Sequence, residues 1–262
     1  MRLGTPKLLV VDIGNTNAVI GVYEGTTLAG HWRLSSQPHR TADEIMVFLR
    51  GFFETSGLAV SDVKAVAMAS VVPSLTPMFD SVSRTLFGTA PLIVGPGVRT
   101  GMSIRYDDPR EVGADRIVNA VAAYTRYKKE LIVVDFGTAT TFDCVSQDGA
   151  YLGGVIAPGI GVSMEALTAR ASKLPKFALD RPPHVIGKNT VHAMQAGLYF
   201  GYAAMVDGLI ERLTAEMGGK PVILATGGTA RLVAAETRHI VHIDEHLTLE
   251  GLRIIYALNE TA

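Results

Sequence analysis

Two short segments of the chain place a carboxylate at the end of an apolar strand and then turn through glycine. The first is Asp12-Ile-Gly-Asn-Thr-Asn17, and the second is Asp135-Phe-Gly-Thr-Ala-Thr140. Glycine and short polar side chains let backbone N–H groups approach phosphate closely, and a carboxylate can hold the accompanying metal ion. Either copy alone is also good chemistry for an ordinary turn. The recurrence favours two turns that hold one nucleotide from both sides.

The two carboxylates are candidate cation ligands. Asp12 would orient Mg²⁺ through bound waters, because Mg²⁺ gives up its hydration shell reluctantly. Asp135 offers a second carboxylate, and hydroxyl groups follow it at Thr138, Thr140 and Thr141. The sequence does not distinguish K⁺ from Mg²⁺ at Asp135.

A third candidate is the segment Gly113-Ala-Asp115-Arg116. Asp115 stands at the start of a predicted helix, where its charge complements the helix dipole, so it could simply be an N-cap. A functional interpretation uses the opposite charges of Asp115 and Arg116 to bind and activate a substrate. Asp115 would accept a proton from a substrate hydroxyl, and Arg116 would donate a forked pair of hydrogen bonds to an acceptor group.

Apolar periodicity and turn signals predict an α/β protein whose two halves follow one plan. In the first half, a helix begins at Thr41, with Glu44 completing a capping box and Ile45, Phe48, Leu49 and Phe52 forming its apolar face. The expected strands of this half are 8–12, 18–23, 28–34, 63–72 and 91–94, and a second helix covers 74–87.

The second half repeats the plan as helix 115–129, strands 131–135, 139–145, 151–156 and 222–225, a long helix from about Thr190 to Met217 and a C-terminal helix. Asp148-Gly149 is a turn between two of these strands. This order implies duplicated lobes, residues 1–112 and 113–262, with a cleft between them and a hinge near Val112. The Met1–Lys7 extension has no functional interpretation.

The long helix carries glycine at positions 197, 201 and 208 among several alanines. Each interior glycine costs about 1 kcal/mol relative to alanine, so several together require a reason. The reason is close approach of another helix, either within the chain or in a homodimer.

Composition excludes several classes of protein. The 24 lysines and arginines nearly balance the 25 aspartates and glutamates, so there is no electrostatic case for a nucleic acid or an anionic membrane. The lone Cys144 excludes an internal disulfide and is expected to be buried in a strand. The seven histidines show no metal-ligand spacing with it. No apolar run is long enough to span a membrane, and no signal peptide is evident, so a cytoplasmic protein is expected.

In combination and in this order, the motifs resemble those of the type III pantothenate kinases, within the acetate and sugar kinase/Hsp70/actin superfamily. The resemblance covers nearly the whole chain. It rests on the two acidic turns, on Gly113-Ala-Asp-Arg116, and on segments 187–190, 193–197, 206–210 and 226–229. It implies duplicated actin-like (ribonuclease H-like) lobes with mixed sheets and an ATP cleft, the second lobe carrying a dimerisation helix.

The resemblance also implies a reaction: ATP-dependent phosphorylation of pantothenate to 4′-phosphopantothenate, with Mg²⁺ and a monovalent cation, K⁺ or NH₄⁺. Asp115 would be the general base and Asp135 the K⁺ ligand. Thr190 could also cap the long helix, and Tyr106 could be a packing tyrosine. The implied ATP-binding residues are Asp12, Ile13, Gly14, Asn15, Thr16, Asn17, Ala18, Val19 and Thr138, and the implied pantothenate-binding residues are Tyr106, Gly113, Ala114, Asp115, Arg116 and Thr190.

Two alternatives remain at this point. One is another small-acceptor kinase of the same superfamily, and the other is a non-catalytic, actin-like nucleotide-binding regulator. The Asp115-Arg116 pair argues against the regulator, because a protein that only binds nucleotide needs no proton acceptor for a second substrate.

Overall fold

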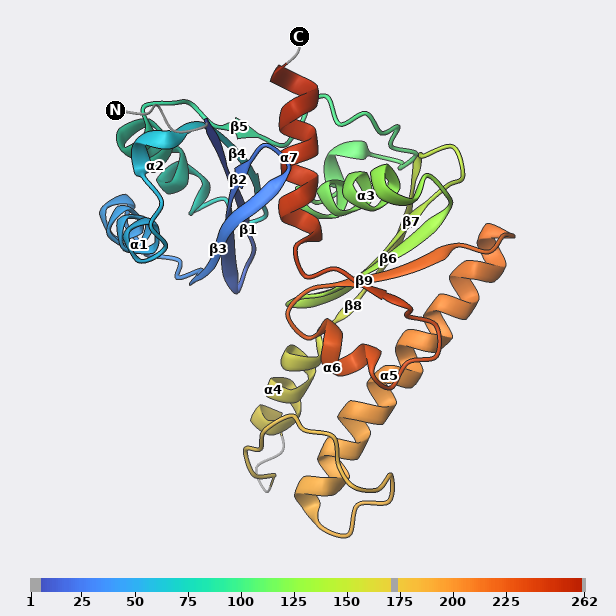
Figure 1. The fold of residues 1–262 in the computed structure, drawn as a ribbon. Helices are drawn as coiled ribbons and strands as arrows, with labels where there is room; N and C mark the ends of the chain where they lie inside the picture. The colour runs from blue at the N-terminus through green and yellow to red at the C-terminus, as the bar shows by residue number, and fades with distance from the viewer. Residues whose placement is uncertain (1–5, 171–173, 261–262) are drawn as a thin grey trace. The chain divides into compact units, whose positions relative to one another are not determined.

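The computed structural model describes residues 6–170 and 174–260 of the chain (Figure 1). The chain divides into two compact units. The first contains the chain up to Met102, the segment Asp107–Ala122 and the chain from Leu247 onward, and the second contains Ser103–Tyr106 and Ala123–His246. The sequence predicts a boundary near Val112 between the two lobes of a duplicated fold. These units are defined differently, by spatial contacts, so that boundary stays a prediction.

The first unit is built on a five-stranded sheet in the order β3-β2-β1-β4-β5. Strands β1 (Lys7–Ile13), β2 (Asn17–Glu24) and β3 (Thr27–Ser35) form an antiparallel meander. Strands β4 (Val63–Ser70) and β5 (Leu92–Ile93) extend the sheet in parallel on the other side of β1. Short 3-10 turns, η1 (Val60–Asp62) and η2 (Pro109–Glu111), precede β4 and the next helix.

Helices cover both faces of this sheet. Helices α1 (Ala42–Thr55) and α2 (Thr76–Phe87) bury one apolar face of β1, β2 and β4. Helix α7 (Leu247–Glu260) lies on the opposite face (Figure 1). A Cβ built on Gly21 of β2 would come within 2.9 Å of the Leu249 side chain, so glycine there permits the close approach of α7.

Helix α1 confirms the predicted capping box. The Thr41 side chain accepts a hydrogen bond from the Glu44 backbone, and the Glu44 carboxylate accepts one from the Thr41 N–H at 2.7 Å. The predicted apolar face is wrong at Phe48, which is 42% exposed. Its ring lies instead beneath the Arg40 guanidinium at 4.9 Å, and Phe53 fills the core.

The second unit repeats the topology of the first with its own five strands, in the order β10-β9-β6-β7-β8. Strands β6 (Leu131–Phe136), β7 (Ala139–Val145) and β8 (Tyr151–Pro158) form the antiparallel meander. Strands β9 (Val222–Thr226) and β10 (His242–Ile243) follow in parallel beyond β6. Helix α3 (Ala114–Tyr127) begins in the first unit and ends in the second.

Helices α4 (Ile160–Arg170), α5 (Thr190–Met217) and α6 (Ala230–Ala234) complete the second unit. The sequence predicted α5 with these bounds but missed α4 and α6. The predicted cap at Thr190 is wrong, because the Asn189 side chain caps α5 by accepting the His192 N–H at 2.8 Å. The expected burial of Cys144 in a strand is confirmed.

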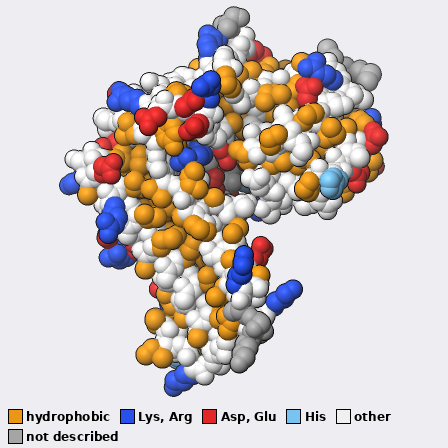
Figure 2. All heavy atoms as spheres, turned by 180° about the vertical axis from the view of Figure 1, so that it is seen from behind, with side chains coloured by type: hydrophobic (Ala, Val, Ile, Leu, Met, Phe, Trp, Pro, Cys, Tyr) orange, Lys and Arg blue, Asp and Glu red, His pale blue; other side chains and the backbone are white. Residues whose placement is uncertain are grey.

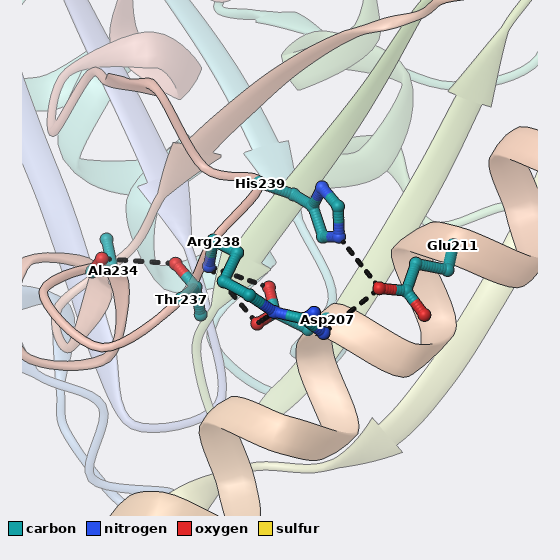
Figure 3. Close-up of polar contacts among 6 residues, drawn as sticks. All are labelled: Asp207, Glu211, Ala234, Thr237, Arg238 and His239. Carbon is teal, nitrogen blue, oxygen red and sulfur yellow. Dashed lines mark hydrogen bonds and ion pairs between the residues drawn. The ribbon is translucent and has the colours of Figure 1, made fainter.

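A polar cluster fastens α5 to the segment after α6 (Figure 3). Asp207 of α5 is only 4% exposed, and its carboxylate accepts hydrogen bonds from the backbone N–H and Nε of Arg238 at 3.0 Å. One turn further along α5, Glu211 accepts from Arg238 Nη2 and pairs with His239 Nε2, each at 3.0 Å. Glu211 remains half exposed, so this part of the cluster lies at the surface while Asp207 is buried.

Candidate active site

The first acidic turn connects β1 and β2. Asp12 is the penultimate residue of β1 and lies in register with Val19 of β2 and Ala69 of β4. Ser36, just after β3, fixes the turn by donating its Oγ–H to the Gly14 carbonyl at 2.6 Å and its N–H to the Thr16 carbonyl at 2.8 Å. The turn residues Asn15, Thr16 and Asn17 are exposed. A ligand in solvent can therefore reach this turn.

Two residues of the predicted nucleotide-binding segment point elsewhere. The side chains of Ile13 and Ala18 lie in the apolar core of the first unit, with at most 1% exposed. Any contact that Ile13 or Ala18 makes with a ligand must therefore come from the backbone.

The segment Gly113–Arg116 begins helix α3, which starts at Ala114. Asp115 is thus within the first helical turn, and the expectation that it is the N-cap is wrong. Its Oδ1 accepts the Arg116 N–H at 2.8 Å. A Cβ on Gly113 would come within 2.5 Å of the same oxygen, so glycine leaves the room that the carboxylate occupies.

Burial raises the pKa of the Asp115 carboxyl above its ordinary value, against the opposing effects of the Arg116 N–H and the Arg116 charge. Arg116 itself is 7% exposed. A carboxylate that is desolvated in this way binds a proton more readily than one in water. This suits a group that must take a proton from a hydroxyl.

Asp12 and the start of α3 lie at the same end of the first sheet. β1 and β4 run in parallel, and the Val71 N–H donates to the Ile13 carbonyl at 3.0 Å just beyond their ends. A Cβ on Gly113 would lie 3.7 Å from the Val71 side chain. The structure therefore brings the first acidic turn and the candidate base to the carboxyl end of one parallel strand pair, where open sheets bind ligands.

The second acidic turn connects β6 and β7 in the second unit. Asp135 is the penultimate residue of β6 and lies in register with Thr141 of β7 and Thr226 of β9. Thr138 is exposed, and its carbonyl accepts the Gly159 N–H at 3.0 Å. Of the three hydroxyls that follow Asp135, the Thr140 hydroxyl is buried and pairs with the Tyr202 hydroxyl.

Two glycines, to which the sequence analysis assigned no role in the site, lie directly against this turn. A Cβ on Gly227, whose φ is +95°, would come within 2.5 Å of Asp135 Oδ1. A Cβ on Gly159 would come within 2.3 Å of the Thr138 carbonyl oxygen. The signal for Gly227 was present in the Thr226-Gly-Gly-Thr229 segment, but only the fold shows which carboxylate it adjoins.

The remaining predicted residues, Tyr106 and Thr190, also belong to the second unit. Tyr106 is 36% exposed, and its ring packs against Tyr151 with centroids 6.4 Å apart. Thr190 is exposed in the first turn of α5. That the residues of the two units act on one nucleotide and one acceptor stays a prediction.

Similarity to known proteins identifies the family. The profile of the family described as type III pantothenate kinase matches residues 8–212. The chain is 55% identical to the type III pantothenate kinase of Myxococcus xanthus over 255 residues. These are 97% of this chain and 100% of that protein. The chain belongs to the type III pantothenate kinase family. The corresponding protein of Geobacter sulfurreducens is 52% identical over 252 residues, which are 96% of this chain and 99% of that protein.

The fold of this family member agrees with the one implied by its sequence. Its structure aligns with MreB 5 of Spiroplasma citri bound to AMPPNP with a TM-score of 0.54 and 11% identity, over 98% of each chain. At that identity the likeness concerns the fold alone. Together with the repeated strand order of the two sheets, it confirms the expected duplicated actin-like architecture.

Proposed function

We propose that this type III pantothenate kinase family member transfers a phosphoryl group from ATP to the terminal hydroxyl of pantothenate, the first step towards coenzyme A. The observation that carries the proposal is identity above 50% to members of that family across almost the whole chain. The reaction needs a group that aims the hydroxyl and takes its proton, because phosphoryl transfer relies on positioning and electrostatic stabilisation. Asp115 supplies that group.

The remaining residues have separate roles in this proposal. In the first unit, the exposed residues 15–17 of the turn bind the phosphates of ATP, the Gly14 N–H holds the turn closed by donating to the Asn17 carbonyl at 3.1 Å, and Asp12 orients Mg²⁺ through water. Arg116 donates hydrogen bonds to pantothenate beside Gly113 and Ala114. In the second unit, Thr138 contacts ATP, and Tyr106 and Thr190 contact pantothenate.

Asp135 is the proposed ligand of a monovalent cation, K⁺ or NH₄⁺. The groups around Asp135 fit a hard cation, because its register partners, Thr141 and Thr226, bring hydroxyl oxygens and no sulfur or imidazole. Within residues 6–170 and 174–260, no three His, Cys, Asp or Glu side chains cluster as a metal site. A cation held by one carboxylate and neutral oxygens would offset negative charge on the phosphates. Glycine at position 227 leaves the space beside Asp135 Oδ1 that a side chain would fill.

We also propose that the protein acts as a homodimer through α5. A Cβ built on Gly197, Gly201 or Gly208 would meet no atom of the described residues within 4 Å, so packing within the chain does not explain these glycines. Figure 2 shows apolar side chains gathered over the end of the second unit that carries α4 and the first half of α5. On α4, Val162 and Leu167 are 41% and 38% exposed.

In the part of the chain that the structure describes, no helix is long and apolar enough to cross a membrane. We propose that the reaction takes place in the cytoplasm.

The deciding experiment measures ADP release from MgATP by the purified protein, with and without pantothenate and with K⁺ or Na⁺. We expect release that requires pantothenate and is faster in K⁺. Acetate and hexoses serve as competing acceptors. Release with acetate or a hexose but not with pantothenate would establish another acceptor, and ATP-driven pelleting without any transfer would establish a regulator instead.

A further inference from the structure

A buried carboxylate that the proposed function does not use lies in the second sheet. Asp143 of β7 is 0% exposed. The Tyr151 hydroxyl donates to its Oδ1 at 2.7 Å, and the Thr141 hydroxyl donates to its Oδ2 at 3.1 Å. Burying a carboxylate is costly unless it is hydrogen-bonded, so this arrangement requires all three side chains to be held together.

The Tyr151 side chain supports the residue proposed to bind the acceptor. Tyr151 is fully buried, and its ring contacts that of Tyr106 at an interplanar angle of 50°. A Cβ on Gly153 would lie 3.4 Å from the Tyr106 ring, and φ at Gly153 is +114°. Tyr106 therefore rests on a surface formed by Tyr151 and the bare backbone of Gly153.

The backbone next to Tyr106 is fixed to the same strand. The Tyr151 N–H donates to the Ser103 carbonyl, and the Arg105 N–H donates to the Tyr151 carbonyl, both at 2.8 Å. Arg105 Nη2 also pairs with the Asp148 carboxylate at 2.6 Å, in the turn between β7 and β8. The backbone N–H and carbonyl of Tyr151 are thus both hydrogen-bonded to the segment just before Tyr106, on either side of Ile104.

The other end of this network reaches the second acidic turn. Thr141 lies in register with Asp135 across the β6–β7 pair. Directly paired residues of antiparallel strands point to the same face of a sheet, as do residues two apart on one strand. Asp135, Thr141 and Asp143 therefore share one face, opposite to the one that buries Phe142 and Cys144 in the apolar core.

We propose that Asp143 and Tyr151 are positioning residues for the acceptor substrate, which act by holding the Tyr106 ring in its binding orientation. Neither residue touches the reacting atoms. The inference rests on the proposed function, because it takes Tyr106 to contact pantothenate. It predicts a selective effect: loss of the Tyr151–Asp143 hydrogen bond weakens use of the acceptor and leaves use of ATP unchanged.

The test compares Tyr151→Phe and Asp143→Asn with Tyr124→Phe as the matched control. Tyr124 is also a tyrosine of the second unit, and its hydroxyl donates to the Gln147 carbonyl at 3.2 Å in the same β7–β8 turn. Steady-state rates are measured with pantothenate varied at saturating MgATP and with MgATP varied at saturating pantothenate. We expect the KM for pantothenate to rise about tenfold in Tyr151→Phe, the effect of one lost hydrogen bond, and by a smaller factor in Asp143→Asn, whose amide oxygen still accepts the bond but carries no charge. The KM for ATP should stay within about twofold of wild type in both variants.

A second measurement does not depend on turnover. The protein is labelled with 3-fluorotyrosine, and the Tyr106 resonance is assigned by its loss in Tyr106→Phe. Asp143→Asn leaves the Tyr106 and Tyr151 rings intact and removes the charge that strengthens the Tyr151 hydrogen bond, so a shifted or broadened Tyr106 resonance in this variant reports weaker support. We expect that change in Asp143→Asn and not in Tyr124→Phe.

The outcomes separate the two proposals. If the KM for pantothenate stays within about twofold in Tyr151→Phe, or if both KM values rise together, the positioning role is overturned. The same holds if Tyr124→Phe has an equal effect. If the wild type shows no pantothenate-dependent ADP release, the proposed function fails, and an unmoved Tyr106 resonance in Asp143→Asn then overturns the positioning role as well. Should Asp143→Asn fail to fold, Tyr151→Phe, which keeps the buried ring, decides the question through the kinetics.

Discussion

Asp12 and Asp135 occupy the same position in two copies of one sheet. Each is the penultimate residue of the first meander strand, with an antiparallel neighbour on one side and a parallel neighbour on the other. The strand orders β3-β2-β1-β4-β5 and β8-β7-β6-β9-β10 correspond strand by strand. The repeated acidic turn is therefore a consequence of a duplicated fold, and a chance recurrence of turn residues does not explain it.

Turnover should depend more on Asp115 than on any other residue. Asp115→Asn keeps the shape and the hydrogen bond from the Arg116 N–H, so we expect the fold and ATP binding to be retained. Loss of the proton acceptor should lower kcat by about 100-fold or more. Calorimetry with ATP and pantothenate-dependent ADP release measure the two properties. Asp80→Asn, at an exposed ion pair on α2, is the control, and turnover near the wild-type rate in Asp115→Asn would remove Asp115 from the mechanism.

The same residue predicts the acidic limb of the pH profile. Burial raises the pKa of Asp115, and the carboxyl must be deprotonated to accept the substrate proton. As pH falls through this raised pKa, kcat/KM for pantothenate should therefore decline, and the decline should begin above the ordinary aspartate value of 3.8. The profile of kcat/KM against pH, taken where thermal melting shows the protein folded, measures it. An acidic limb at or below the ordinary value would contradict the role of burial.

Gly113 should be required for the position of the Asp115 carboxylate. Alanine at this position would place a Cβ 2.5 Å from Asp115 Oδ1, so the carboxylate must move. A displacement of this kind at a reacting group lowers rates by about 10-fold to 100-fold, and we expect Gly113→Ala to lower kcat in this range. Gly51→Ala is the matched control, since a Cβ on Gly51 of α1 meets open space. It should stabilise the helix by about 1 kcal/mol and leave kcat unchanged.

Several features that depend on neighbouring residues were predicted correctly from the sequence. The capping box at Thr41, the strand that ends at Asp12 and the long helix that begins at Thr190 all follow from local spacing. Asn189 rather than Thr190 caps that helix because both residues are good caps and only the backbone decides which one precedes the first turn.

Features that join distant residues could not be predicted in this way. Gly227 lies against Asp135 only because β9 pairs with β6 across almost ninety intervening residues, and Tyr106 meets Tyr151 only after β8 has formed. The local sequence around Asp143 gives no sign that the Tyr151 and Thr141 hydroxyls donate hydrogen bonds to its carboxylate. These partners meet only because of the order in which the strands pair. The pattern of neighbouring residues in a single sequence does not reveal that order.

The exposed glycines of α5 should mark the dimer interface. Gly201→Arg places a long charged side chain where close helix approach is proposed, so we expect the dimer to dissociate. Light scattering should give a mass near 27.9 kDa, that of one chain. Ala215→Arg, at an exposed position near the other end of the same helix, is the control and should leave the mass unchanged. A wild-type protein that is already monomeric would contradict the homodimer.

The cluster around Glu211 predicts how the stability of the second unit depends on pH. The hydrogen bond with His239, followed by the charge of Arg238, lowers the pKa of the Glu211 carboxyl below its ordinary value of 4.5. A carboxyl with a lowered folded-state pKa stabilises the protein above its unfolded-state pKa, and this contribution disappears as pH falls through the folded-state value. The difference in Tm between wild type and Glu211→Gln should therefore shrink towards zero as the pH falls below the ordinary glutamate value of 4.5. Thermal melts from pH 7 to pH 3 measure it, with Glu216→Gln, another exposed glutamate of α5, as the control. A difference that persists unchanged at pH 3 would mean that Glu211 stabilises the cluster by packing and not by its charge.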